Sequence, residues 1–249
     1  MSISITQQFG ASVAGASNPT LTATPGSSIA AGALVIGVFR QGAGGAISGV
    51  GTPSGGGVTT WTTGPTDNNI HEWTAAVWYG ISTGGTSPVT LALTATTTNG
   101  HFDVMECSGF DGGFQIDGTP AHSNGQNATS VTTSTTPGAG KNVLLISIFD
   151  TQGTTSITPT GYTAGNNGGP GGTPWVYQIV PSTTSSAYSI TWAAGYARYA
   201  VLLVAIEAIA GGGGGGPVMP ATGQLYPFPA NVAQQFASTT RTFGQLFPF

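Results

Sequence analysis

The chain has 249 residues, enough for one large β domain or two small ones, and only 5% of them are charged. About 25% is typical of soluble proteins, so the surface must consist of Ser, Thr, Asn, Gln and backbone, unlike that of an ion-pair-rich cytosolic enzyme. Four basic residues against eight acidic ones give a net charge of −4, which argues against nucleic-acid binding, because that binding needs clustered Lys and Arg.

The single cysteine, Cys107, excludes an internal disulfide and any two-cysteine metal site. Its neighbours read as a strand, which predicts a small buried apolar side chain rather than a reactive thiol. The first residues lack the basic start and apolar core of a signal peptide. The longest apolar run, Tyr199 to Ala210, is too short for a membrane span and contains Glu207. We therefore expect synthesis in a cytoplasm, with no export signal and no membrane span.

Short, β-branched apolar stretches bounded by Gly, Pro, Asn, Ser and Thr predict an all-β body with almost no helix. In chain order the expected strands are Ala33 to Arg40, Trp73 to Ile81, Val89 to Thr94, His101 to Ser108, Val143 to Phe149, Trp175 to Val180, Ala187 to Trp192 and Tyr199 to Ile209.

These strands form an internal repeat, in which the last strand of each half carries a glutamate, Glu106 and Glu207. The matching pairs are Gly32–Phe39 with Lys141–Phe149, Trp73–Tyr79 with Trp175–Val180, Ser87–Leu93 with Ser186–Trp192, and Phe102–Phe110 with Leu203–Ile209. The repeat predicts a jelly-roll or Greek-key β-sandwich over residues 1–209, built from two similar four-strand halves that share one core. Two independent small domains are the weaker alternative.

Three expected strands are apolar almost throughout, which indicates that both of their faces are covered. They begin at Leu34, Val143 and Tyr199. Either an oligomer interface or a long loop folded back over the sheet explains such strands.

Few residues have the spacing that a catalytic or metal-binding site requires. His101 and Asp103 would share a face of one strand, but a solvated His101 at a strand start is the preferred interpretation. The paired Glu106 and Glu207 fit structural hydrogen bonding better than glycoside hydrolysis. We therefore expect no catalytic residue, no metal site, no cofactor and no enzymatic activity.

Most of the many aromatic residues are expected to fill the core. Trp61 and Tyr162, which lie in Gly- and Thr-rich loops, are the candidates for exposure and for contact with a glycan, because flat aromatic rings stack on sugars.

Six consecutive glycines, Gly211 to Gly216, follow the body. Glycine loses more backbone freedom on ordering than any other residue, so residues 210–217 are expected to be a flexible linker. Residues 218–249 then repeat one motif, Gly-Gln-Leu-aromatic-Pro-Phe, at 223–228 and 244–249. We interpret 218–249 as a docking peptide whose contacts with a partner are Leu225, Tyr226, Pro227, Phe228, Leu246, Phe247, Pro248 and Phe249.

Two sets of residues carry a resemblance to known proteins. Ala31 to Val38, Ala76 to Tyr79, and Val104 to Gly109 leading to Asp117-Gly118-Thr119 resemble a jelly-roll module of phage appendages and secreted bacterial proteins, over about residues 20–209. The ending 244–249 is similar to the C-termini of minor tail proteins of actinobacterial phages, although Phe249 stands where a basic residue is expected.

The resemblance implies a non-enzymatic virion protein, released by lysis, that is displayed on the phage tail and aids host attachment. Its implied partners are other virion proteins and copies of itself as a homo-oligomer. Two alternatives stay open, a capsid decoration protein on the head and an adhesion module that binds host cell-surface glycan.

Overall fold

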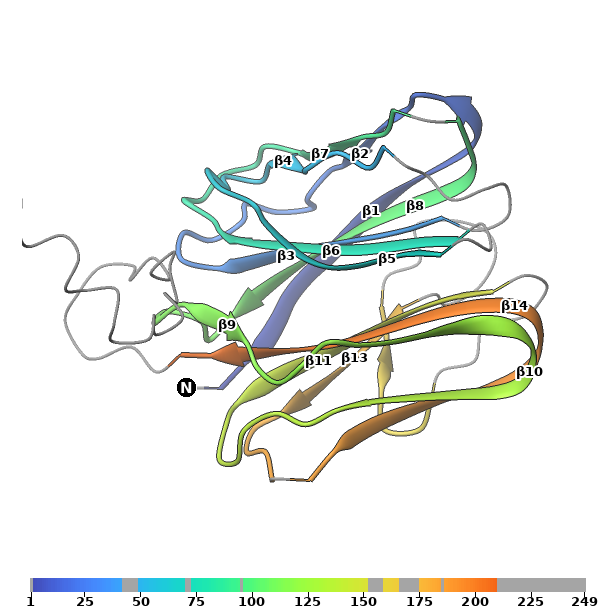
Figure 1. The fold of residues 1–249 in the computed structure, drawn as a ribbon. Helices are drawn as coiled ribbons and strands as arrows, with labels where there is room; N and C mark the ends of the chain where they lie inside the picture. Colours follow the sequence, from blue (N-terminus) through green and yellow to red (C-terminus); the bar gives the residue numbers. More distant parts are fainter. Residues whose placement is uncertain are drawn as a thin grey trace, which may run out of the picture. The chain divides into compact units, whose positions relative to one another are not determined.

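The computed structural model describes residues 2–41, 49–69, 73–94, 96–151, 159–165, 175–184 and 186–209. All of them belong to one compact unit within residues 1–218. They contain fourteen strands and no helix, so the all-β prediction is confirmed (Figure 1). Accordingly, this part of the chain holds no helix able to cross a membrane. The predicted linker and docking peptide, 210–249, lie outside the described residues.

The first half of the chain forms a five-stranded antiparallel sheet. In spatial order its strands are β1 (Ser4–Ser17), β8 (Thr96–Ser108), β3 (Leu34–Gln41), β6 (Trp73–Ile81) and β5 (Thr62–Asn69). A separate small sheet orders β2 (Thr20–Ala23), β7 (Val89–Ala92) and β4 (Ser54–Gly55).

The second half forms a sheet with the same order of equivalent strands. They are β10 (Ala121–Thr135), β14 (Tyr188–Ala208), β11 (Val143–Thr151), β13 (Trp175–Val180) and β12 (Thr163–Ala164), and the short β9 (Phe114–Ile116) pairs with the end of β14. The internal repeat predicted from the sequence is therefore present in the topology.

The register supports the same equivalence. Glu106 of β8 lies opposite Val35, the second residue of β3, and Glu207 of β14 lies opposite Val143, the first residue of β11. On its other side each glutamate faces a glutamine, Gln7 or Gln115. Glu106 and Glu207 therefore occupy similar places in the two sheets, each opposite the beginning of the neighbouring strand and opposite a glutamine.

The prediction of four strands per half was wrong, because in the described residues the first main sheet has five strands and the second has six, with β9 included. The missed strands β1 and β10 line corresponding edges. The two strands predicted over 187–192 and 199–209 are one long strand, β14, while their counterparts in the first half are separate strands, β7 and β8. The sandwich is present, whereas the jelly-roll connectivity stays a prediction.

The two main sheets share one apolar core, as predicted for a sandwich. It joins Leu34, Ile36 and Val38 of β3 with Leu144, Ile146 and Ile148 of β11, all essentially inaccessible to solvent. Burial of each such side chain stabilises the fold by about 1.5–3 kcal/mol. Two independent small domains are therefore excluded.

The chain itself covers the outer faces of both main sheets. Leu21, Val89 and Leu91 of the small sheet pack with Val35 and Phe39 in one outer cluster. In the second half, residues near the start of β14 and the end of β10 pack on the outer face of their own sheet, namely Val131, Ile190 and Trp192 against Phe149, Val201 and Leu203. Figure 1 shows the β10–β14 pair curving back at the end of the sandwich. Intrachain packing thus accounts for the continuously apolar strands, and no oligomer interface is needed to explain them.

Candidate functional site

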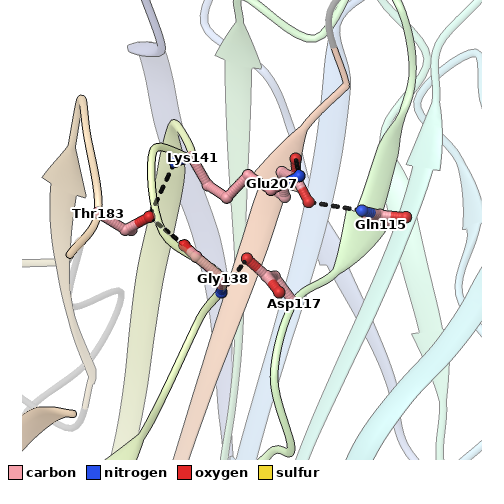
Figure 2. A network of polar contacts seen from close by, with 6 residues as sticks. All are labelled: Gln115, Asp117, Gly138, Lys141, Thr183 and Glu207. Carbon is pink, nitrogen blue, oxygen red and sulfur yellow. Dashed lines mark hydrogen bonds and ion pairs between the residues drawn. The ribbon is translucent and has the colours of Figure 1, made fainter. Parts of the chain in front are cut away.

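The end of the sandwich where the chain passes into the Gly-rich segment carries a network of polar contacts (Figure 2). At its centre, Glu207 is almost fully buried near the end of β14. Its Oε1 accepts a hydrogen bond from Lys141 Nζ at 2.7 Å, and its Oε2 accepts one from Gln115 Nε2 at 2.5 Å. The glutamate therefore ties β9 and the loop before β11 to the last strand.

The network continues into the neighbouring loops. Thr183 Oγ1 accepts a hydrogen bond from the Lys141 backbone amide at 2.9 Å and donates one to the Gly138 carbonyl, and the Gly138 amide donates to Asp117 Oδ2 at 2.9 Å. Gln115 lies in β9 and Glu207 in β14, and the other four residues lie in the loops between strands, as Figure 2 shows. The hydrogen bond to Glu207 raises the pKa of Lys141, and the negative charge of Glu207 adds a smaller effect in the same direction. Lys141 therefore stays charged at neutral pH, and the ion pair is kept.

The backbone of the same segment is also held. The Ala208 amide donates to the Asn142 carbonyl at 3.0 Å, and the Ile209 amide donates to the Gly113 carbonyl at 3.1 Å. Three successive residues, 207, 208 and 209, are thus each bonded to the body. Hydrogen bonds therefore hold the chain to the body as far as Ile209, the last residue before the predicted linker at 210–217.

Glu106 forms the equivalent contact in the first half. Its Oε2 accepts a hydrogen bond from Gln7 Nε2 at 2.6 Å, and its Oε1 accepts one from the Ala30 amide at 2.8 Å. Gln7 Nε2 also donates to the Ser27 carbonyl at 3.2 Å. The predicted structural hydrogen bonding of both glutamates is confirmed. The glutamine partners were not predicted from the sequence, because only the strand register places them opposite the glutamates.

A second polar group is buried between the sheets. Trp175 Nε1 of β13 donates to Asp103 Oδ2 of β8 at 3.1 Å, linking the two halves. His101 shares that face of β8 and lies opposite Arg40 in the register. Burial first, and then the charge of Arg40, lower the pKa of His101 to about 4, so its ring is neutral at pH 7.

The interpretation of His101 as a solvated residue at a strand start was wrong, since its side chain is 1% exposed. The reason is that β8 begins five residues earlier, at Thr96. His101 and Asp103 do share a face, as predicted. Within the described ranges, however, no three His, Cys, Asp or Glu side chains form a group that could hold a metal ion.

Trp61 and Tyr162 occupy similar places, each directly before an edge strand of its half, β5 or β12. Both are half-buried and pack on the outer clusters of their sheets. Trp61 Nε1 and Tyr162 Oη are buried without a hydrogen-bond partner, and burial raises the pKa of Tyr162 to about 12. Glycan contact by these two residues stays a prediction.

The predicted docking residues, Leu225, Tyr226, Pro227, Phe228, Leu246, Phe247, Pro248 and Phe249, all lie outside the described residues. Comparison with known proteins adds no candidate role: no family model matches the chain, and no curated protein or solved structure is significantly similar to it.

Proposed function

We propose that this protein is a non-enzymatic structural component of a tailed-phage particle, a minor tail protein that docks through its C-terminal peptide. The observation that carries the proposal is the pairing of two features. Hydrogen bonds hold the chain to the sandwich as far as Ile209. Beyond the glycine run, the chain repeats one aromatic-proline motif.

The chemistry of the motif suits docking. Proline restricts the backbone to extended conformations, so Pro227 and Pro248 reduce the entropy that the peptide loses on binding. The aromatic and leucine side chains beside them supply apolar anchors for pockets on a neighbour. Two copies, separated by 15 residues, suit two equivalent pockets on a symmetric partner or on a ring of identical subunits.

The body suits display on a particle. Its surface has few charges, and its buried carboxylates Glu106 and Glu207 are both engaged in hydrogen bonds that hold strands and loops together. These features support a scaffold role.

Labelling of particles tests the proposal. An antibody raised against residues 1–209 is applied to purified particles, which are then viewed in negative stain. The proposal expects label at the tail. Label on the head would assign the protein to capsid decoration instead, and particles without label would contradict a structural role.

A further inference from the structure

Strand β14 has neighbouring strands on both sides up to its last residues. Glu207 lies opposite Val143 of β11 on one side and opposite Gln115 of β9 on the other. Ala208 likewise lies opposite Phe114 of β9. A strand in this position can leave its sheet only when the hydrogen bonds on both sides break. The end of β14 is therefore held from two directions.

The sequence continues beyond this strand, from residue 210 to Phe249. In the proposed function, residues 218–249 dock onto a particle, and the body is connected to the particle through that contact. A force that separates the two is then transmitted along the chain and enters the body at Ile209. The contacts of residues 207–209 are the first that such a force reaches.

The Glu207 carboxylate bridges the two neighbours of β14. Its Oε1 accepts a hydrogen bond from Lys141 Nζ, just before β11, at 2.7 Å, and its Oε2 accepts one from Gln115 Nε2 of β9 at 2.5 Å. The Glu207 side chain is 8% exposed, so water competes little for its two oxygens. Both hydrogen bonds have to break before Glu207 can move along the direction of the strand.

Two backbone hydrogen bonds follow directly after Glu207. The Ala208 amide donates to the Asn142 carbonyl at 3.0 Å, on the side of β11. The Ile209 amide donates to the Gly113 carbonyl at 3.1 Å, on the side of β9. Hydrogen bonds between antiparallel strands run perpendicular to the strands. A pull along β14 therefore strains the bonds on both sides together instead of one after another.

The corresponding glutamate of the first half, Glu106, accepts its two hydrogen bonds from neutral donors, the Gln7 side chain and the Ala30 amide. Glu207 has the Lys141 ammonium in place of the amide, which adds an attraction between opposite charges. The chain after β8 continues within the body to β9, whereas the chain after β14 leaves the described body. The charged contact thus lies at the strand end where an external force would act.

We propose that the contacts of residues 207–209 anchor the end of β14 against a force that pulls on residues 210–249. These contacts allow a docked tail to hold the body without drawing β14 out of its sheet. The inference rests on the proposed function, because docking through the tail is the source of the force. It adds a mechanical role for Gln115, Lys141 and Glu207.

Degradation of tagged full-length protein tests the anchor. An ATP-dependent protease that unfolds its substrate from a tagged terminus applies its pulling force at that terminus, and the rate of forced unfolding then controls the rate of degradation. The tag is placed after Phe249. Gln115→Ala removes one hydrogen bond to Glu207, and we expect it to speed degradation about fivefold.

Gln7→Ala is the matched control, because it removes the corresponding hydrogen bond to Glu106 in the first half. It should lower the free energy of unfolding by a similar amount but change degradation from the C-terminal tag by less than about twofold. With the tag at the N-terminus the order of the two variants should reverse, since Gln7 lies in β1. Equal acceleration of both variants from either end would overturn the proposal, because overall stability alone would then set the rate. So would an unchanged rate for Gln115→Ala with the C-terminal tag.

Lys141→Met tests the ion pair separately, because methionine is unbranched like lysine but carries no charge. We expect faster degradation of this variant from the C-terminal tag and a change of less than about twofold from the N-terminal tag. The same acceleration from both tags would contradict a mechanical role for the ion pair. None of these measurements involves a particle, so failure of the anchor is distinct from failure of the proposed function.

Discussion

Cys107 lies in the shared core with no exposed surface. Burial, with a smaller effect from the neighbouring Glu106 charge, raises the pKa of its thiol. Because the thiolate is the reactive form, Cys107 should react with a thiol reagent only when the sandwich opens. We expect labelling of the native protein to be at least a hundredfold slower than labelling in denaturant. Rapid labelling without denaturant would contradict the buried position.

His101 should make the stability of the body depend on pH. Its pKa is about 4 when folded and about 6.5 when unfolded, so the unfolded state binds the proton first as pH falls. The stabilisation that neutral His101 contributes is fully present above pH 6.5 and is lost as the pH falls toward 4. The total loss in the free energy of unfolding is on the order of 3 kcal/mol. Urea unfolding at several pH values measures this loss.

His101→Gln is the control for that measurement, because glutamine does not titrate. The variant should show a flatter stability profile between pH 4 and pH 6.5. A profile as steep as that of the wild type would assign the dependence to other groups.

Between elements, the two glutamate–glutamine hydrogen bonds should each stabilise the fold, by similar and independent amounts. Gln7→Ala and Gln115→Ala each remove a hydrogen bond to a buried carboxylate, and each should cost about 1–3 kcal/mol. Because the pairs belong to different sheets, the double variant should show additive losses within about 0.5 kcal/mol.

Denaturant unfolding measures these losses. Thr22→Ala, on the exposed face of β2, is the control and should change stability by less than about 0.5 kcal/mol. A lower free energy of unfolding in only one of the two glutamine variants would show that the two hydrogen bonds are not equivalent.

Prediction of the elements succeeded where apolar residues are dense. β3, β11 and β13 are rich in Val, Leu and Ile, so their positions follow from composition. β10 could not be found this way, because Val131 is its only large aliphatic residue. Its structure comes from pairing with β14, which is distant in sequence. Likewise, Gln7 and Gln115 became recognisable as partners only once the register placed them opposite the glutamates.

At the scale of the whole molecule, neither half should fold alone. Separation would expose the inner faces of β3 and β11, which bury their apolar side chains against each other's sheet. We expect residues 1–110 and 111–209, expressed separately, to bind a hydrophobic dye and to lack a cooperative thermal transition. A cooperative transition in either fragment would contradict the shared core.

The two tail motifs should contribute together to docking. Loss of one motif, by Phe228→Ala with Leu225→Ala, leaves the other able to bind, whereas loss of both removes the linked binding that raises affinity by about 10²–10⁴-fold. Incorporation into particles should therefore fall moderately for the single-motif variant. It should fall below detection when Leu246→Ala and Phe249→Ala are added.

Incorporation of a truncated chain into particles measures whether residues 210–249 are needed for docking. Full-length protein and a chain ending at Ile209 are supplied during particle assembly, and the amount of each in purified particles is measured by quantitative mass spectrometry. We expect the truncated chain to remain folded and soluble yet to be absent from particles. Its incorporation at the level of the full-length protein would contradict docking through the C-terminal peptide.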